Sequence, residues 1–75
     1  MQEEKKEMKK LSQKVVRKFL DRNEMSLEDF SNLVEISIAT AHKLAEKGHI
    51  PRRIMAHRIE RKTGGQITMG DFGYQ

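Results

Sequence analysis

The stretch SLEDFSNLVEISIATAHKLAEKG, residues 26–48, decides the fold of this 75-residue chain. Apolar side chains recur in it at the three- and four-residue spacing of amphipathic helices. Ser26 and Ser37 each precede one such run and are typical helix N-caps, and Ile36 lies between the runs as an apolar residue in the turn. Gly48 follows the second run and accepts the positive φ that ends many helices. The stretch therefore predicts two short helices joined by a tight turn, which is a helix-turn-helix arrangement.

The two predicted helices differ in what their outer faces can do. The first buries a face made of Leu27, Phe30, Ser31 and Val34, and the small Ser31 lies where the second helix must cross closely. At 100° per residue, the second helix gathers its small and apolar side chains on one arc, namely Ser37, Ala41, Leu44 and Ala45. Its opposite arc has no apolar stripe to bury and holds Ile38, Ala39, His42, Lys43 and Glu46. That opposite arc is free to contact a partner, for which the first candidate is the major groove of DNA.

Length and composition predict a small intracellular protein. Seventy-five residues allow one domain with a small core, and the absence of cysteine excludes disulfides, thiolate zinc sites and a cysteine nucleophile. No apolar run approaches the length of a membrane span, so we expect a cytoplasmic protein. The formal net charge is +4, and its excess lies in residues 51–75, with five lysines or arginines and two acids. A cationic segment after a free helical face suits a polyanion, although a solvated surface explains charge alone equally well.

The remaining segments predict one all-α domain. Residues 1–10 are expected to form a polar, flexible tail, with a polar extension of the first helix as the alternative. Residues 11–75 are expected to form the domain, with the helix-turn-helix motif at residues 26–48. A first helix is expected from Ser12, as its N-cap, to Arg22. A fourth helix is expected to start at Ile50 and Pro51 and to end at Thr63–Gly65, with Met55, Ala56 and Ile59 buried and Ile54 partly covered. Capping-box spacing from Thr68 to Asp71 predicts one further short turn, whose Met69 and Phe72 pack on the core.

Three segments carry a family resemblance: SLEDFSNLVEISIATAHKL (26–44), EKGHIPRR (46–53) and IMAHRIERKTGGQITMGDF (54–72). The run from Val16 to Phe72 resembles the small phage-repressor class of helix-turn-helix proteins, and more narrowly Cro-like and YdaS-like proteins. The resemblance implies a compact lambda-repressor-like domain of four to five short helices. It also implies a DNA-binding transcriptional regulator, often a phage or prophage repressor or the antitoxin of a toxin pair. Glu35 stands where the family usually has glycine, a departure that predicts a reshaped turn.

The second helix of the motif supplies the candidate base-reading residues. Its N-terminal part would enter the major groove first. Ile38 and Ala39 would contact thymine methyl groups, His42 a purine edge, and Lys43 the O6 and N7 atoms of guanine. Each of two residues also has a simpler interpretation. Ile38 could serve dimerisation or simply be an exposed apolar residue without a function. Lys43 could be a solvated side chain or a plain phosphate contact.

Phosphate contacts are expected from helix N-termini and from the cations after the second helix. The candidates are Ser26, Ser37, Lys47, His49, Arg52 and Arg53. For both serines, helix capping alone is the simpler interpretation. Arg58 and Arg61 lie further along and are expected to be ordinary surface residues.

Catalysis and metal binding find no support in the sequence. His42, His49 and His57 match no two-histidine helical metal site, and no serine or threonine has a base with an orienting third group. We therefore expect no enzyme activity, no metal and no cofactor.

The sequence predicts a sequence-specific binder of double-stranded DNA, and specifically a Cro-like repressor that binds a pseudo-palindromic operator as a homodimer. The alternative is an antitoxin or antirepressor whose helix-turn-helix face binds a protein such as a toxin or a repressor. RNA binding is weaker, because Tyr74 and three phenylalanines offer no platform on which bases stack.

Overall fold

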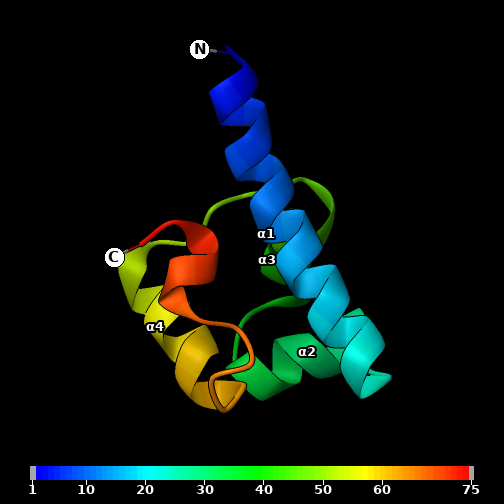
Figure 1. The fold of residues 1–75 in the computed structure, drawn as a ribbon. Coiled ribbons are helices and arrows are strands. Elements are labelled where there is room, and N and C mark those ends of the chain that lie inside the picture. Colours follow the sequence, from blue (N-terminus) through cyan, green and yellow to red (C-terminus); the bar gives the residue numbers. More distant parts are fainter. Residues whose placement is uncertain (1, 75) are drawn as a thin grey trace.

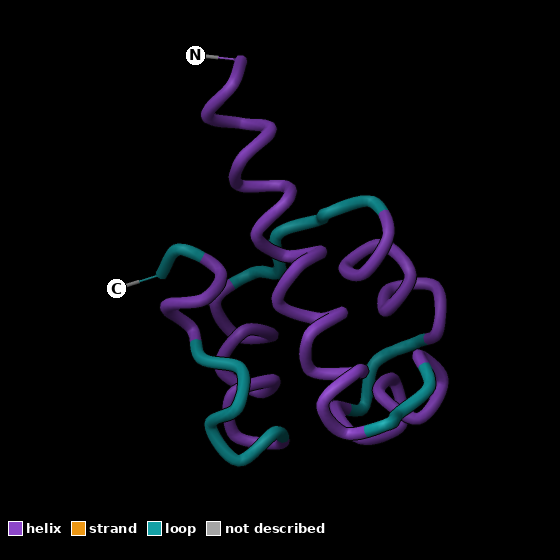
Figure 2. Tube along the Cα trace, turned by 45° about the vertical axis from the view of Figure 1, so that its right-hand side comes forward, coloured by secondary structure: helices purple, strands orange, loops and turns teal. Residues whose placement is uncertain are grey.

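The computed structural model describes the backbone of residues 2–74 and the side chains of residues 11–74. Within this range the chain is helical throughout and has no strand (Figures 1 and 2). The elements are α1 (Gln2–Asn23), α2 (Leu27–Val34), α3 (Ile38–Glu46), α4 (Arg53–Lys62) and the 3₁₀ helix η1 (Met69–Phe72). This confirms the predicted small all-α, helix-turn-helix-like fold. None of the described helices combines the length and the apolar character needed to cross a lipid bilayer.

Helix α1 begins at Gln2, ten residues before the predicted start. The predicted polar tail, residues 1–10, thus continues the backbone of α1 from Gln2 onward, and its side chains lie outside the described residues. The prediction that Ser12 is the N-cap is wrong. Lysine and glutamate are good helix formers, so residues 2–10 extend the helix without a capping residue at Ser12.

Ser12 instead lies buried in the middle of α1, where it holds the end of α3. Its hydroxyl oxygen is 3.1 Å from the carbonyl oxygen of Leu44 and 2.9 Å from that of His49. The neighbouring Gln13 side-chain amide donates to the carbonyl of Glu46. Leu44 and Glu46 lie in the last turn of α3, where carbonyl groups have no intrahelical partner, and His49 follows the helix. Helix α1 therefore fixes the point at which α3 ends.

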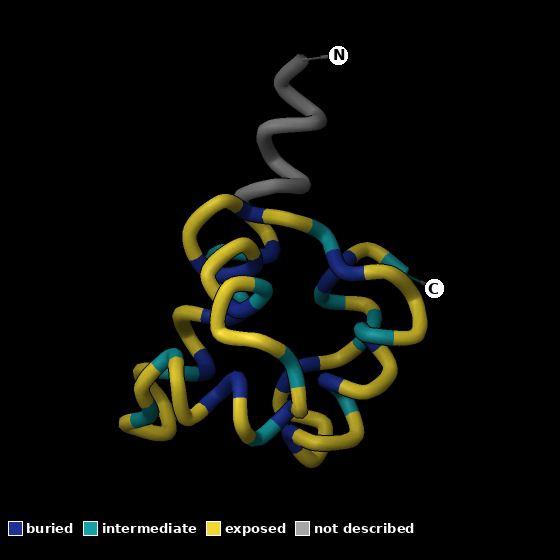
Figure 3. The backbone as a smooth tube through the Cα atoms, turned by 180° about the vertical axis from the view of Figure 1, so that it is seen from behind, coloured by how far each residue is buried: buried dark blue, intermediate teal, exposed yellow. Residues whose placement is uncertain are grey.

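The core lies between the four helices and η1, and Figure 3 marks the buried positions along the chain in dark blue. Its buried apolar members are Val16, Phe19, Phe30, Val34, Ala41, Leu44, Ala45, Ala56, Ile59, Ile67 and Phe72. The rings of Phe19 and Phe30 meet edge to face, with their centroids 5.7 Å apart. Ser31 is buried on α2, which packs directly on α3, as expected of the small residue on that face.

The start of α4 differs from the prediction. Pro51 is not the first helical residue, because Arg52 is the N-cap with extended φ and ψ of −64° and 160°, and the helix begins at Arg53. The carbonyl of the buried Pro51 accepts a hydrogen bond of 2.7 Å from the Tyr74 hydroxyl. A proline disfavours the helical conformation in the residue before it, so Ile50 stays outside the helix, and Ile50 and Pro51 lie in the connection between α3 and α4.

Helix α4 ends at the predicted place, where the Thr63 side chain hydrogen-bonds to the backbone on both sides of the helix end. The buried Thr63 hydroxyl donates to the Ile59 carbonyl at 2.7 Å and accepts from the Ile67 amide at 3.1 Å. Gly64 and Gly65 follow with φ of 64° and 85°, a backbone that resists residues with a Cβ atom. These hydrogen bonds and the two glycines turn the chain back toward the core, where Ile67 is buried.

The last short helix confirms the predicted capping box. The Thr68 hydroxyl accepts from the Asp71 amide at 3.2 Å, and the Asp71 carboxylate accepts from the Thr68 amide at 2.9 Å. Phe72 is buried and Met69 is half-buried against the core. Both residues pack as the sequence predicts.

We predict that Ser12→Ala destabilises the domain by about 1–3 kcal/mol, because it leaves the carbonyls of Leu44 and His49 without their donor. Urea unfolding followed by circular dichroism measures the change. The control is Lys14→Ala, an exposed position on the same helix, which should stay within about 0.5 kcal/mol of the parent. Equal stability of the two variants would show that the Ser12 contacts contribute nothing.

Candidate nucleic-acid interface

Helix α3 presents its predicted outer face to solvent. Ser37 caps the helix, and its hydroxyl accepts from the Thr40 amide at 3.1 Å. Ala41, Leu44 and Ala45 are buried, which turns the opposite arc outward. All four predicted base-reading residues are exposed on this arc: Ile38, Ala39, His42 and Lys43. The predicted face therefore exists as one continuous helical surface.

His42 is paired on this surface with Glu46, one helical turn further along. Its Nδ1 atom lies 3.0 Å from a carboxylate oxygen of Glu46, and both side chains are half exposed. The pair orients the imidazole ring and leaves Nε2 open for a ligand. The four-residue spacing of the two residues is visible in the sequence.

The turn between α2 and α3 keeps a left-handed residue although the chain has no glycine there. Glu35 has φ 59° and ψ 49°, so the predicted reshaping of the turn does not occur. The Ile36 amide donates to the Ser31 carbonyl at 2.9 Å and closes the turn. Ile36 itself is half-buried against the core, as predicted. The turn therefore has a left-handed residue at this position, although a residue with a Cβ atom adopts that conformation only at an energetic cost.

Two cations of α4 surround Glu35. The Lys62 ammonium lies 3.0 Å from its carboxylate, and the Arg58 guanidinium donates to its carbonyl at 3.2 Å. The hydrogen bond from Lys62, and then the Lys62 charge, hold the pKa of the Glu35 carboxyl below its ordinary value. These contacts tie the turn of the motif to α4.

A cation-lined depression connects α3 with α4. It encloses about 340 Å³ and is lined by Thr40, Lys43, His49, Arg52, Ile54, Met55 and Arg58. Lys47 joins Lys43 and His49 at an adjoining depression beside Gly48. The fold therefore brings one predicted base-reading residue, Lys43, together with three predicted phosphate-binding residues.

Three residues of this depression differ from the prediction, namely Arg58, Ile54 and Met55, and Met55 is half-buried where it was expected to be buried. Arg58 was expected to be ordinary surface, yet it lines the depression beside Lys43 and is oriented by the Glu35 carbonyl. Ile54 was expected to be partly covered, but its side chain is 79% exposed. Helix α4 begins at Arg53, and its inward positions are Ala56 and Ile59, so Ile54 faces solvent. No local pattern predicts that Arg58 and Lys43 line one depression, because the packing of α4 against the other helices decides it.

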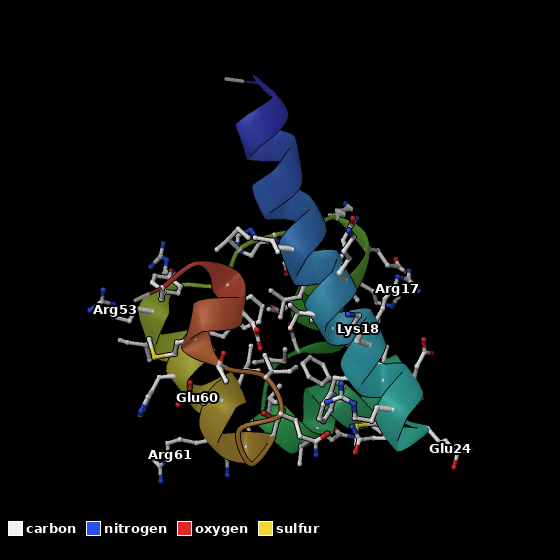
Figure 4. All side chains as sticks on the ribbon, in the orientation of Figure 1. Arg17, Lys18, Glu24, Arg53, Glu60 and Arg61 are labelled. Atoms are coloured by element: carbon white, nitrogen blue, oxygen red, sulfur yellow. The ribbon has the colours of Figure 1, made fainter. Side chains whose placement is uncertain are left out.

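The other predicted phosphate-binding residues lie apart from the depression. The Arg53 guanidinium lies over the Tyr74 ring, 5.7 Å from its centroid, and Figure 4 shows Arg53 toward the C-terminal end of the chain. The Ser26 hydroxyl accepts from the Asp29 amide at 3.0 Å, so Ser26 and Ser37 both act as helix caps. No group of three metal-ligating side chains occurs among the described residues.

Comparisons of this chain with known protein families, with curated proteins and with solved structures gave no significant match.

We predict that Glu35→Gly unfolds about 4 °C above Glu35→Ala in thermal denaturation. Both variants lose the Lys62 ion pair, whereas only glycine adopts the left-handed backbone without a Cβ clash. A melting temperature of the glycine variant equal to or below that of the alanine variant would contradict a strained turn.

A second prediction concerns acid stability. Because folding lowers the pKa of Glu35, its contribution is present above the ordinary value of 4.5 and is lost as the pH falls through the lower folded value. The parent should therefore lose slightly more stability than Glu35→Gln between about pH 5 and about pH 3. Denaturant midpoints across this range measure the difference, and identical pH profiles would rule the contribution out.

Proposed function

We propose that this chain is a sequence-specific binder of double-stranded DNA that inserts α3 into the major groove. The observation that carries the proposal is the outer face of α3, which the core leaves free and which ends beside the cation-lined depression. A helix of this kind fits the major groove, and cations at its side meet the phosphates that border the groove.

The proposed roles follow from the chemistry of the exposed side chains. Ile38 and Ala39 lie in the first turn of α3 and suit thymine methyl groups. Lys43 has the donor that guanine O6 and N7 accept, and His42 offers the ring nitrogen that Glu46 does not occupy. Sequence preference in this proposal comes from these four residues.

Affinity in the proposal comes from the depression. Arg52, Arg58 and His49 lie with Lys43 along one surface, and Lys47 adjoins it. Contacts from such side chains to phosphate add binding energy and salt dependence without sequence preference. Arg53 contributes less in this arrangement because its guanidinium is packed on Tyr74.

The proposed biological role is a Cro-like repressor. Two copies would bind a pseudo-palindromic operator, with their α3 helices about 34 Å apart, and would block a promoter. The protein would then act in the cytoplasm, on the nucleoid. Binding as a homodimer is part of the proposal.

A second candidate function is favoured by the exposed apolar side chains near the same face. Ile54 is 79% exposed within the depression and Ile38 is 44% exposed on α3. Apolar side chains ringed by arginines are typical of protein-binding surfaces. An antitoxin or antirepressor would use this surface for a protein partner.

We predict that selection of bound duplexes from a random library yields an inverted repeat that survives a moderate rise in salt. Lys43→Ala should relax the preference at one base pair per half-site, at a cost of about 1–3 kcal/mol. Arg52→Ala should weaken all duplexes alike and reduce the salt slope by about 1.

Arg61→Ala is the matched control, since Arg61 is an exposed arginine of α4 outside the depression beside Lys43. Recovery of only random sequence, or equal losses for Arg61→Ala and Arg52→Ala, would overturn the proposed interface. Retention of a protein partner by Lys43→Ala and Arg52→Ala, without any DNA selectivity, would support the second candidate.

A further inference from the structure

A groove on the other side of α1 has no role in the proposed DNA interface. It encloses about 300 Å³ between α1 and the segment from Gln66 to Asp71. In Figure 1, α3 lies behind α1, and in the same orientation Figure 4 shows Lys18, which lines the groove, in front. Around α1, the mean direction of the groove positions lies roughly 140° from the mean direction of Ser12 and Gln13, the positions that contact the end of α3.

The floor of the groove is apolar. Leu11 is 44% exposed and is one of three large apolar side chains that the described residues leave so open. Val15 follows one turn later and is half-buried, and the edge of the buried Phe19 closes the floor. Leu11 thus stays partly open, and water contacts this strip.

The rim of the groove is cationic. Lys14, Lys18 and Arg22 line it at successive turns of α1, about 6 Å apart along the helix axis. No described acid forms an ion pair with any of the three. The one acid of the groove is Asp71, and its carboxylate already accepts from the Thr68 amide.

We propose that this groove binds an acidic amphipathic segment of a partner protein. Apolar side chains of the segment would cover Leu11 and Val15, and carboxylates spaced one helical turn apart would meet the three cations of the rim. A phosphate backbone does not use the apolar floor. A second copy of this chain fits the groove poorly. Among the described residues, Ile54 is the most exposed large apolar side chain that a second copy could offer to the floor. Ile54 lines a depression together with Arg58, so its approach would bring cations to the cationic rim. The proposal is independent of what α3 binds.

The test uses the full chain and a synthetic helical peptide with leucines at positions i and i+4 flanked by glutamates. Titration followed by amide chemical shifts should show saturable binding, with shifts at Leu11, Val15 and Gln66. The same peptide with serine in place of each leucine should bind at least about tenfold more weakly, since the apolar floor is then left uncovered.

Charge reversal provides the matched variants. Lys18→Glu should weaken peptide binding at least about tenfold, whereas Arg61→Glu, the same charge change on α4, should leave it within about twofold. Both positions are exposed, and circular dichroism verifies that each variant folds. Leu11→Ser, at an exposed position, tests the floor separately.

Three results of the peptide titration would overturn the proposal, and so would one result of a separate competition with DNA. They are equal binding of the leucine and serine peptides, shifts at Lys43 and Arg52 in place of the groove, and no saturable binding at millimolar peptide. Displacement of the peptide from the groove by duplex DNA would also overturn it, because the groove would then be a nucleic-acid site. The titration is made without DNA, so its failure leaves the proposed role of α3 untouched.

Discussion

The buried hydroxyl of Ser12 is the contact on which the placement of α3 depends. It joins the middle of α1 to the Leu44 and His49 carbonyls, at the point where α3 ends and the chain turns toward α4. A helix of nine residues has little stability alone, so its direction is set by what holds its two ends. Ser37 caps the first end and Ser12 secures the last. The free outer face of α3 follows from these two anchors together with the buried alanines.

Charge separation is the second property that the fold creates. Residues 11–50 carry six cations and six acids, so the sequence shows no excess there. The structure places Lys14, Lys18 and Arg22 along one groove of α1, while Lys43 joins Arg52 and Arg58 at another surface. Two cationic surfaces thus flank one small core. They differ in what accompanies the charge, since an apolar floor lies under the first and the face of a helix borders the second.

The interpretation of the sequence succeeded where the signal is local. The caps at Ser26, Ser37 and Thr68 form the predicted hydrogen bonds, because a side chain and an amide three residues apart need no distant partner. It failed at Ser12 and Pro51. Residues 2–10 extend α1 past Ser12, and the helix after Pro51 begins only at Arg53. Each residue instead has a hydrogen bond to a distant part of the chain, which no local pattern contains.

The sequence by itself determined the helical elements of the motif, the packed faces of α2 and α3 and the four exposed residues of α3, since periodicity and capping are local properties. Only the tertiary structure decided that Arg58 lies beside Lys43, that Ile54 is exposed and that Leu11 opens onto a groove. These facts depend on how α4 and residues 66–71 pack against the other helices. At Glu35 the sequence shows only a non-glycine residue in the turn of the motif. The packing of α4 against that turn decides that Lys62 and Arg58 bind Glu35.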